Sequence, residues 1–156
     1  MLNPIDKRRL KFEKNTFDES DNETMELYWI DVNATLKKYE NVYQSYIANN
    51  INITENSFAY IELSNEIIKE FNVDFATASN MINNFNFINE LLVWIFISYD
   101  EKNEIYKINI RSRGPIINTI ASNFNGGGHK FASGARLKNK EEIEALKEAL
   151  DLACKE

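Results

Sequence analysis

The residues best suited to chemistry lie in the stretch 123–136, which reads NFNGGGHKFASGAR. Four of the five glycines of the chain fall within nine residues here, and His129 is the only histidine. A helix end needs a single residue at positive φ, so Gly126, Gly127 and Gly128 together exceed that need. Backbone N–H groups without side chains can form an anion-binding concavity, and His129 can donate to a phosphate oxygen. The stretch predicts phosphate binding, with a tight, closely packed turn as the alternative.

Polar side chains at the end of a predicted strand extend this candidate site. Arg111, Ser112 and Arg113 lie at the end of the predicted strand 105–112, and ligand crevices of α/β sheets open at strand ends. Arginine binds phosphate through bidentate, charge-assisted hydrogen bonds. The hydroxyls of Ser112 and Ser133 are further candidate donors. The alternative for the Arg-Ser-Arg run is a solvated strand end.

Known phosphate motifs and metal centres do not fit the sequence. Phe131 stands where both the P-loop and the dinucleotide-binding pattern need a glycine. One histidine and scattered aspartates argue against a two-metal hydrolytic centre built from this chain. We therefore expect no cofactor and no complete catalytic set here, with His129 in an assisting role. The single cysteine, Cys154, excludes an internal disulfide and is interpreted as a tolerated surface thiol.

The bulk composition limits the partners of the protein. The chain has 156 residues, enough for one domain with its own core, and a net charge of −6. This charge argues against broad electrostatic binding of nucleic acid, so a polyanion must be met at a local site. The longest apolar run, 91–97, is too short to cross a bilayer. We expect a cytoplasmic protein with no membrane partner.

Hydrophobic periodicity predicts an α/β fold: a single domain with a mixed β-sheet covered by helices. Residues 1–30 are interpreted as a junction segment and 31–156 as the domain. Strands are predicted at 57–63, 90–99, 105–112 and 133–138. Helices are predicted from Asp31, from Ser64 to Phe71, from Asp74 to Phe85, from Asn118, and from Asn139 to the C-terminus. The apolar run at 90–99 indicates a central strand covered on both faces.

The stretch 111–136, RSRGPIINTIASNFNGGGHKFASGAR, resembles the DHH-associated C-terminal domain of DHH phosphoesterases. That family shows an Arg-Ser strand end, a short helix with an Ile-Ala pair, four glycines and a histidine, and a small-residue segment ending in glycine. The resemblance extends over roughly 50–156. Asn125 replaces the first family glycine and is expected, with the glycines, to be one of the substrate-binding residues. Asparagine tolerates the left-handed conformation better than other non-glycine residues.

The resemblance implies a function. The family includes RecJ-type nucleases, nanoRNases (some also acting on 3′-phosphoadenosine 5′-phosphate) and cyclic dinucleotide phosphodiesterases. In its members an N-terminal Asp-His-His domain carries two Mn²⁺ ions, and the C-terminal domain holds the substrate. Gly126, Gly127, Gly128 and His129 are then expected to meet a phosphate near the metals, with Arg111 and Ser112 holding another part of the nucleotide.

The chain itself contains no Asp-His-His segment. It is therefore expected to be the substrate-binding half of a Mn²⁺-dependent phosphoesterase, inactive alone. Its expected partners are the Asp-His-His domain and a short oligonucleotide or nucleotide phosphate. The alternatives are a tRNA-binding module like that of alanyl-tRNA synthetases and a stand-alone nucleotide sensor. The acidic balance speaks against the tRNA-binding module.

Overall fold

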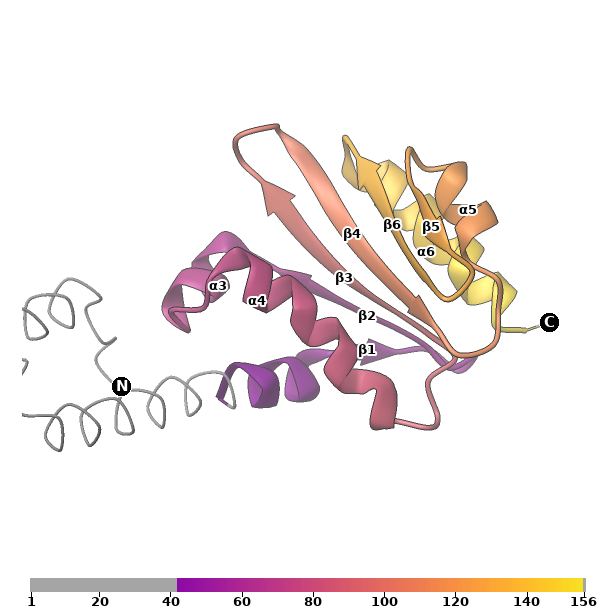
Figure 1. Cartoon of the computed structure of the whole chain (residues 1–156), viewed down its shortest axis with the longest axis horizontal. Coiled ribbons are helices and arrows are strands. Elements are labelled where there is room, and N and C mark those ends of the chain that lie inside the picture. The colour runs from indigo at the N-terminus through magenta and orange to yellow at the C-terminus, as the bar shows by residue number, and fades with distance from the viewer. Residues whose placement is uncertain (1–41, 156) are drawn as a thin grey trace, which may run out of the picture.

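The computed structural model describes residues 42–155, whose arrangement is shown in Figure 1. A helix over residues 42–50 comes first. The elements that follow are β1 (Asn52–Ile53), β2 (Phe58–Leu63), α3 (Asn65–Glu70), α4 (Phe75–Asn80), η1 (Met81–Phe87), β3 (Val93–Asp100), β4 (Ile105–Ser112), α5 (Asn118–Ser122), β5 (Gly127–His129), β6 (Ala132–Leu137) and α6 (Lys140–Ala153). The predicted junction segment and the predicted domain start lie outside the described residues.

The strands form one six-stranded sheet in the order β1-β2-β3-β4-β6-β5. β2 and β3 run parallel, and all other neighbouring strands run antiparallel. Parallel neighbours need a crossover connection, which α3, α4 and η1 supply between β2 and β3 (Figure 1). The predicted α/β fold, a mixed sheet covered by helices, is confirmed.

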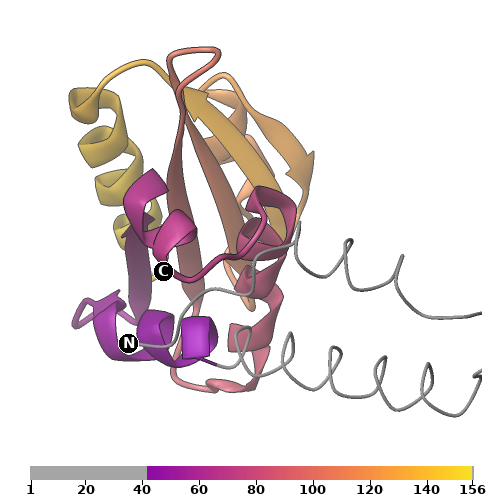
Figure 2. The same cartoon turned by 90° about the vertical axis from the view of Figure 1, so that its left-hand side faces the viewer.

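The central strand β3 is buried on both faces, as its apolar sequence predicts. Trp94 and Phe96 point into a core shared with the helices that precede β3. Val93, Ile95 and Ile97 point into a second core shared with α5 and α6. The two groups of helices come from the two halves of the chain, as the colours of Figure 2 show. Each half therefore contributes one layer to the same sheet.

The earlier helices cover only part of their face of the sheet. Among the described residues, their core includes side chains of β2 and β3 but none of β4, β5 or β6. In Figure 1, none of the described helices lies in front of β4 and β6. The face of these strands that looks away from α5 and α6 is therefore left open.

The predicted α-helix from Asp74 to Phe85 is wrong in its second half. α4 ends at Asn80, and the chain continues as the 3₁₀ helix η1. A 3₁₀ helix has three residues per turn, and Ile82 and Phe85, three residues apart, are both buried in the core. The indole Nε1 of buried Trp94 donates to the Ile82 carbonyl at 2.8 Å. The apolar spacing and this tertiary hydrogen bond both favour the tighter winding.

Two predicted helix starts are confirmed by their caps. The Ser64 hydroxyl accepts a hydrogen bond from the backbone N–H of Ile67 at 3.3 Å and opens α3, which ends at Glu70. The Asn139 side chain accepts one from the backbone N–H of Glu142 at 2.9 Å and opens α6. Each cap satisfies a donor that the first helical turn leaves unpaired.

Two predictions around the glycines are corrected. The N-cap of α5 is Ile117, without a side-chain cap, and Asn118 is already the first helical residue. Part of the glycine stretch, for which a tight turn was the alternative interpretation, forms the edge strand β5, which pairs antiparallel with β6. The two strands form a hairpin connected by Lys130 and Phe131, which lack the Asn-Gly or Asp-Gly signal of a two-residue hairpin turn, so the sequence pattern does not reveal the pairing.

Candidate functional site

Strand register lines up the polar residues of the open face in rows. Arg111 of β4 faces Ala132 of β6, which faces His129 of β5. In the next row Asn109, Gly134 and Gly127 lie side by side. A third row pairs Lys107 with Arg136. Neighbouring strands lie about 4.8 Å apart, so the backbones at Arg111 and His129 stand about 10 Å apart on one face. The sheet thus brings together donors from three strands.

A hollow of about 400 Å³ lies over the second and third rows. Gly127 and Gly134 leave room at its floor because neither carries a side chain. The lining residues are Lys107, Ile108, Asn109, Asn125, Gly126, Gly127, Gly134, Ala135 and Arg136. Arg111 and His129 flank it in the adjoining row.

The three consecutive glycines have different roles. A Cβ at Gly126 would stand 1.9 Å from the carbonyl oxygen of Gly134, so only glycine fits there. Gly128 has φ of +139°, and a Cβ there would stand 2.6 Å from the Ala132 carbonyl oxygen. A Cβ at Gly127 would meet nothing within 4 Å. Close packing explains Gly126 and Gly128, which was the alternative interpretation, whereas Gly127 alone faces open space.

Asn125 provides the positive-φ turn between α5 and the glycines. Its φ is 53°, which confirms that asparagine takes the left-handed conformation here. The N–H groups of Phe124 and Gly126 both donate to the Ala121 carbonyl at 3.0 Å, closing the end of the helix. The exposed Asn125 side chain lies at the rim of the hollow.

Arg111 is held in place by two hydrogen bonds. Its Nε donates to Oδ1 of Asn83 on η1 at 2.9 Å, and its Nη1 donates to the Ile110 carbonyl at 2.9 Å. Partial burial removes part of the hydration of the charged guanidinium, and this lowers the pKa of Arg111. Arg111 nevertheless stays charged at neutral pH, because the arginine pKa lies far above it.

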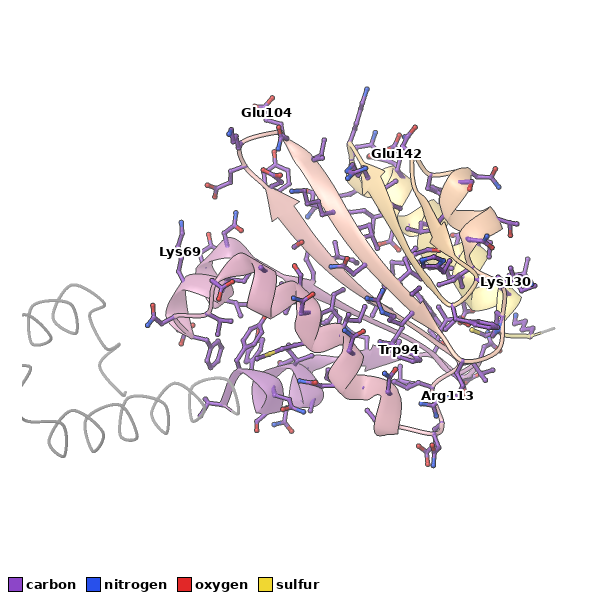
Figure 3. All side chains as sticks on the ribbon, in the orientation of Figure 1. Lys69, Trp94, Glu104, Arg113, Lys130 and Glu142 are labelled. Atoms are coloured by element: carbon purple, nitrogen blue, oxygen red, sulfur yellow. The ribbon has the colours of Figure 1, made fainter. Side chains whose placement is uncertain are left out.

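The Arg113 guanidinium makes its contacts within the protein. Its guanidinium donates to Oδ1 of Asn89 at 3.1 Å and to the carbonyl of Asn86. It also lies 5.8 Å from the centre of the Trp94 ring, a cation–π distance. Figure 3 shows Arg113 at the end of the sheet beside the loop that follows η1. These contacts connect the end of β4 to the crossover, and they occupy donors of the Arg113 guanidinium that a ligand would need.

Ser112 and Ser133 lie on the opposite face from Arg111, because successive strand residues point to opposite faces. Both are buried. Ser112 donates to the Pro115 carbonyl at 2.6 Å, and Ser133 donates to the His129 carbonyl at 2.8 Å. The two hydroxyls stabilise neighbouring turns, and the structure does not bring them to the hollow.

A local excess of basic residues surrounds the open face. Residues 105–140 contain no Asp or Glu, although the whole chain has 24 acidic and 18 basic residues. The basic residues of this segment are Lys107, Arg111, Arg113, Lys130, Arg136, Lys138 and Lys140. An anion therefore meets a favourable local charge despite the net charge of −6.

Sequence reasoning missed Lys107, Asn109 and Arg136. Lys107 forms an ion pair with Asp100 at 2.6 Å, whereas the Arg136 guanidinium is exposed and has no partner among the described residues. Two signals were available: strand alternation places Lys107 and Asn109 on the same face as Arg111, and the segment lacks acids. The pairing of β4 with β6 adds Arg136.

Comparison with known proteins identifies the domain. Residues 55–156 match the family model of the DHHA1 domain. The chain belongs to the DHHA1 domain family. The resemblance to the DHH-associated C-terminal domain is thereby confirmed.

Two curated relatives of this DHHA1 domain are named as oligoribonucleases and PAP phosphatases. The bifunctional oligoribonuclease and PAP phosphatase NrnA of Bacillus subtilis is 30% identical over 111 residues, 71% of this chain and 35% of that protein. A probable NrnA of Streptococcus mutans is 34% identical over 108 residues, 69% of this chain and 34% of that protein. The chain spans about a third of the length of these curated relatives.

Solved structures agree with the DHHA1 fold. An exopolyphosphatase-related protein from Bacteroides fragilis superposes with a TM-score of 0.64 at 25% identity, covering 76% of this chain and 36% of that one. The pGpG-specific phosphodiesterase PggH from Vibrio cholerae has a TM-score of 0.55 at 13% identity, covering 76% and 40% of the two chains. The likeness to PggH shows a shared fold only.

Within residues 42–155, the DHHA1 domain brings together no group of three or more His, Cys, Asp or Glu side chains that could hold a metal. No helix in the same range is long and apolar enough to cross a membrane. Cys154 is half-buried against the core of α5 and α6 rather than a surface thiol. Burial, with a smaller contribution from Asp151, raises its pKa to about 11. At neutral pH this thiol is protonated and a poor nucleophile.

Proposed function

We propose that the open half of the sheet binds the phosphates of a short oligonucleotide or nucleotide for a DHH-type phosphoesterase. The observation that carries the proposal is the row of paired residues that joins Arg111 and His129. This row lies next to the hollow lined by Gly127 and Gly134, in a segment that contains no Asp or Glu. The oligoribonuclease and PAP phosphatase names of the relatives support the same class of substrate.

The positions of the donors suggest a division of roles. Arg111 and His129, on either side of Ala132, grip the phosphate nearest the reaction, with His129 in an assisting role. Arg136 and Asn109 hold the neighbouring part of the nucleotide over the hollow. Ser112 and Ser133 are left out of the ligand contacts that we propose, because their hydroxyls face the other side.

The reaction itself belongs, in this proposal, to an Asp-His-His domain that carries Mn²⁺. The described residues offer cationic and amide donors instead of a cluster of metal ligands. This DHHA1 domain therefore supplies substrate binding and charge stabilisation, and the partner domain supplies the metal-activated nucleophile. A cytoplasmic location remains part of the proposal.

Nuclear magnetic resonance titration of the 156-residue chain tests the binding role. With 3′-phosphoadenosine 5′-phosphate, we expect backbone shifts at β4, β5 and the Gly126–Gly128 stretch, and none on the outer face of α6. Adenosine, which lacks phosphate, is the matched control and should cause much smaller shifts.

Salt dependence separates this proposal from tRNA binding. Neutralising one or two phosphates gives a shallow salt slope, whereas six to ten contacts give a steep one. Tight, steeply salt-dependent binding of tRNA with no effect of the small nucleotide would overturn the proposal.

A further inference from the structure

The 3₁₀ helix η1 presents asparagines toward the end of β4. In a 3₁₀ helix, residues three apart lie above one another on the same edge. Ile82 and Phe85 form the apolar edge in the core. One position further along the chain, Asn83 and Asn86 form a polar edge. The Asn83 side chain accepts from Arg111 of β4, and the Asn86 backbone carbonyl accepts from Arg113, just beyond the end of β4. Asn83 is the member that contacts Arg111.

Chemistry fixes the orientation of the Asn83 amide. The Nε of arginine is a donor only, so the atom of Asn83 that faces it must be the acceptor Oδ1. The two N–H groups of Asn83 Nδ2 therefore make no hydrogen bond with Arg111 and remain available to another acceptor. Asn83 is exposed, and Nδ2 has no hydrogen-bond partner among the described residues.

The Arg111 guanidinium also keeps free donors. Its Nε is occupied by Asn83 and its Nη1 by the Ile110 carbonyl, and no acceptor within residues 42–155 takes a hydrogen bond from Nη2. These two hydrogen bonds fix the plane of the group. Arg113 differs, because Asn89, Asn86 and the Trp94 ring occupy its guanidinium.

We propose that Asn83 and Arg111 form one oxyanion-binding pair. Asn83 acts twice: its Oδ1 orients the Arg111 guanidinium, and its Nδ2 donates to a phosphate oxygen bound by the free Arg111 N–H groups. A cation and a neutral amide thus face the anion with donors only. The inference rests on the proposed function, and it adds a residue of the crossover to a site otherwise built from β4, β5 and β6.

Two aspartate variants of the 156-residue chain test the pair. Asn83→Asp keeps an acceptor for Arg111 but removes both N–H donors and adds a negative charge. We expect it to bind 3′-phosphoadenosine 5′-phosphate about tenfold more weakly or worse. Asn84→Asp is the matched control, because Asn84 is also exposed on η1, whereas the hydrogen bonds of Arg111 within the described residues go to Asn83 and Ile110. It should bind within about twofold of the wild type.

A third variant measures orientation without added charge. Asn83→Ala should weaken nucleotide binding about threefold. In ligand-free protein, it should move the Arg111 Nε–Hε resonance toward the position of a solvent-exposed arginine. The melting temperatures of all three variants should stay within a few degrees of the wild type.

The outcomes separate the two proposals. If the wild type binds and Asn83→Asp binds equally well, or if Asn84→Asp weakens binding as much, the pair is refuted while the proposed function stands. If the wild type binds neither this nucleotide nor inorganic phosphate at millimolar concentration, the proposed function and the ligand part of the pair both fail. An Arg111 Nε–Hε resonance unchanged in Asn83→Ala refutes the orienting role in either case.

Discussion

One face of one sheet carries two regions of opposite character. On β3, Trp94 and Phe96 are buried beneath the crossover helices. Their ladder partners on β4 are Arg111 and Asn109, which lie on the same face but beyond the edge of that core. The change from apolar to polar occurs within a single strand spacing of about 4.8 Å. What separates the packing surface from the proposed binding surface is whether a helix covers it.

The largest expected effect comes from two neighbouring glycines: Gly126 packs against the β6 backbone, whereas Gly127 faces open space. Gly126→Val places a side chain into the β6 backbone, so it should destabilise the domain by about 3 kcal/mol or more and lower its melting temperature by about 10 °C or more. Gly127→Val should fold normally but fill the hollow and abolish nucleotide binding. Calorimetry and titration of both variants check this, and equal melting temperatures would contradict it.

Arg111 and Arg113 sharpen the comparison two residues apart. Arg111→Ala should weaken nucleotide binding about tenfold or more while changing the melting temperature little, because a charge-assisted bond to phosphate is lost. Arg113→Ala should lower the melting temperature and change nucleotide affinity little, since Arg113 contacts Asn89, Asn86 and Trp94. Binding isotherms and thermal melts of the two variants provide the measurement. Similar losses of affinity in both would remove the distinction.

His129→Ala tests the far side of the open face. The His129 side chain is exposed and makes no hydrogen bond within the described residues, so its removal should leave the melting temperature unchanged. Loss of one donor should weaken nucleotide binding about threefold in this chain. In a longer protein that includes an Asp-His-His domain, kcat should fall by about 10²–10³. An unchanged kcat/KM there would remove His129 from the site.

The smallest effect is expected at Asp100, which neutralises Lys107 beside the hollow. Hydrogen bonds from Lys107 and Asn103 hold the Asp100 pKa well below its usual value. A lowered pKa in the folded state contributes stability above the ordinary aspartate value of about 3.9, and that contribution is lost as pH falls further. The stability difference between wild type and Asp100→Asn should therefore be constant from about pH 5 to 8 and shrink in stronger acid.

Asp100→Asn also removes the negative charge paired with Lys107 beside the hollow. Nucleotide affinity should rise about twofold at low salt and return to the wild-type value at high salt, because exposed charges are screened. Titrations at two salt concentrations measure this. A loss of affinity at low salt would show that Lys107 needs Asp100 to hold its position.

Local sequence patterns determined much of the fold. The apolar run of β3 indicated a strand buried on both faces, and the capping residues Ser64 and Asn139 marked two helix starts. Asn125 signalled the left-handed residue before the glycines. The order of motifs over 111–136 was enough to recognise the family. These signals are carried by neighbouring residues, so the sequence alone contains them.

Tertiary structure alone decided which residues of the predicted site are exposed on the open face of the sheet. Gly126 and Gly128 are required by the approach of the β6 backbone and Gly127 is not, a difference that three identical residues in a row cannot express. Arg113 is occupied by asparagines of the crossover, more than 20 positions away in the chain. The 3₁₀ winding that aligns Asn83 with Arg111 coincides with a hydrogen bond from Trp94. The sequence thus determined the strand and its polar residues, while strand pairing and helix coverage, which depend on contacts between distant segments, decided which side chains pack and which remain free to bind.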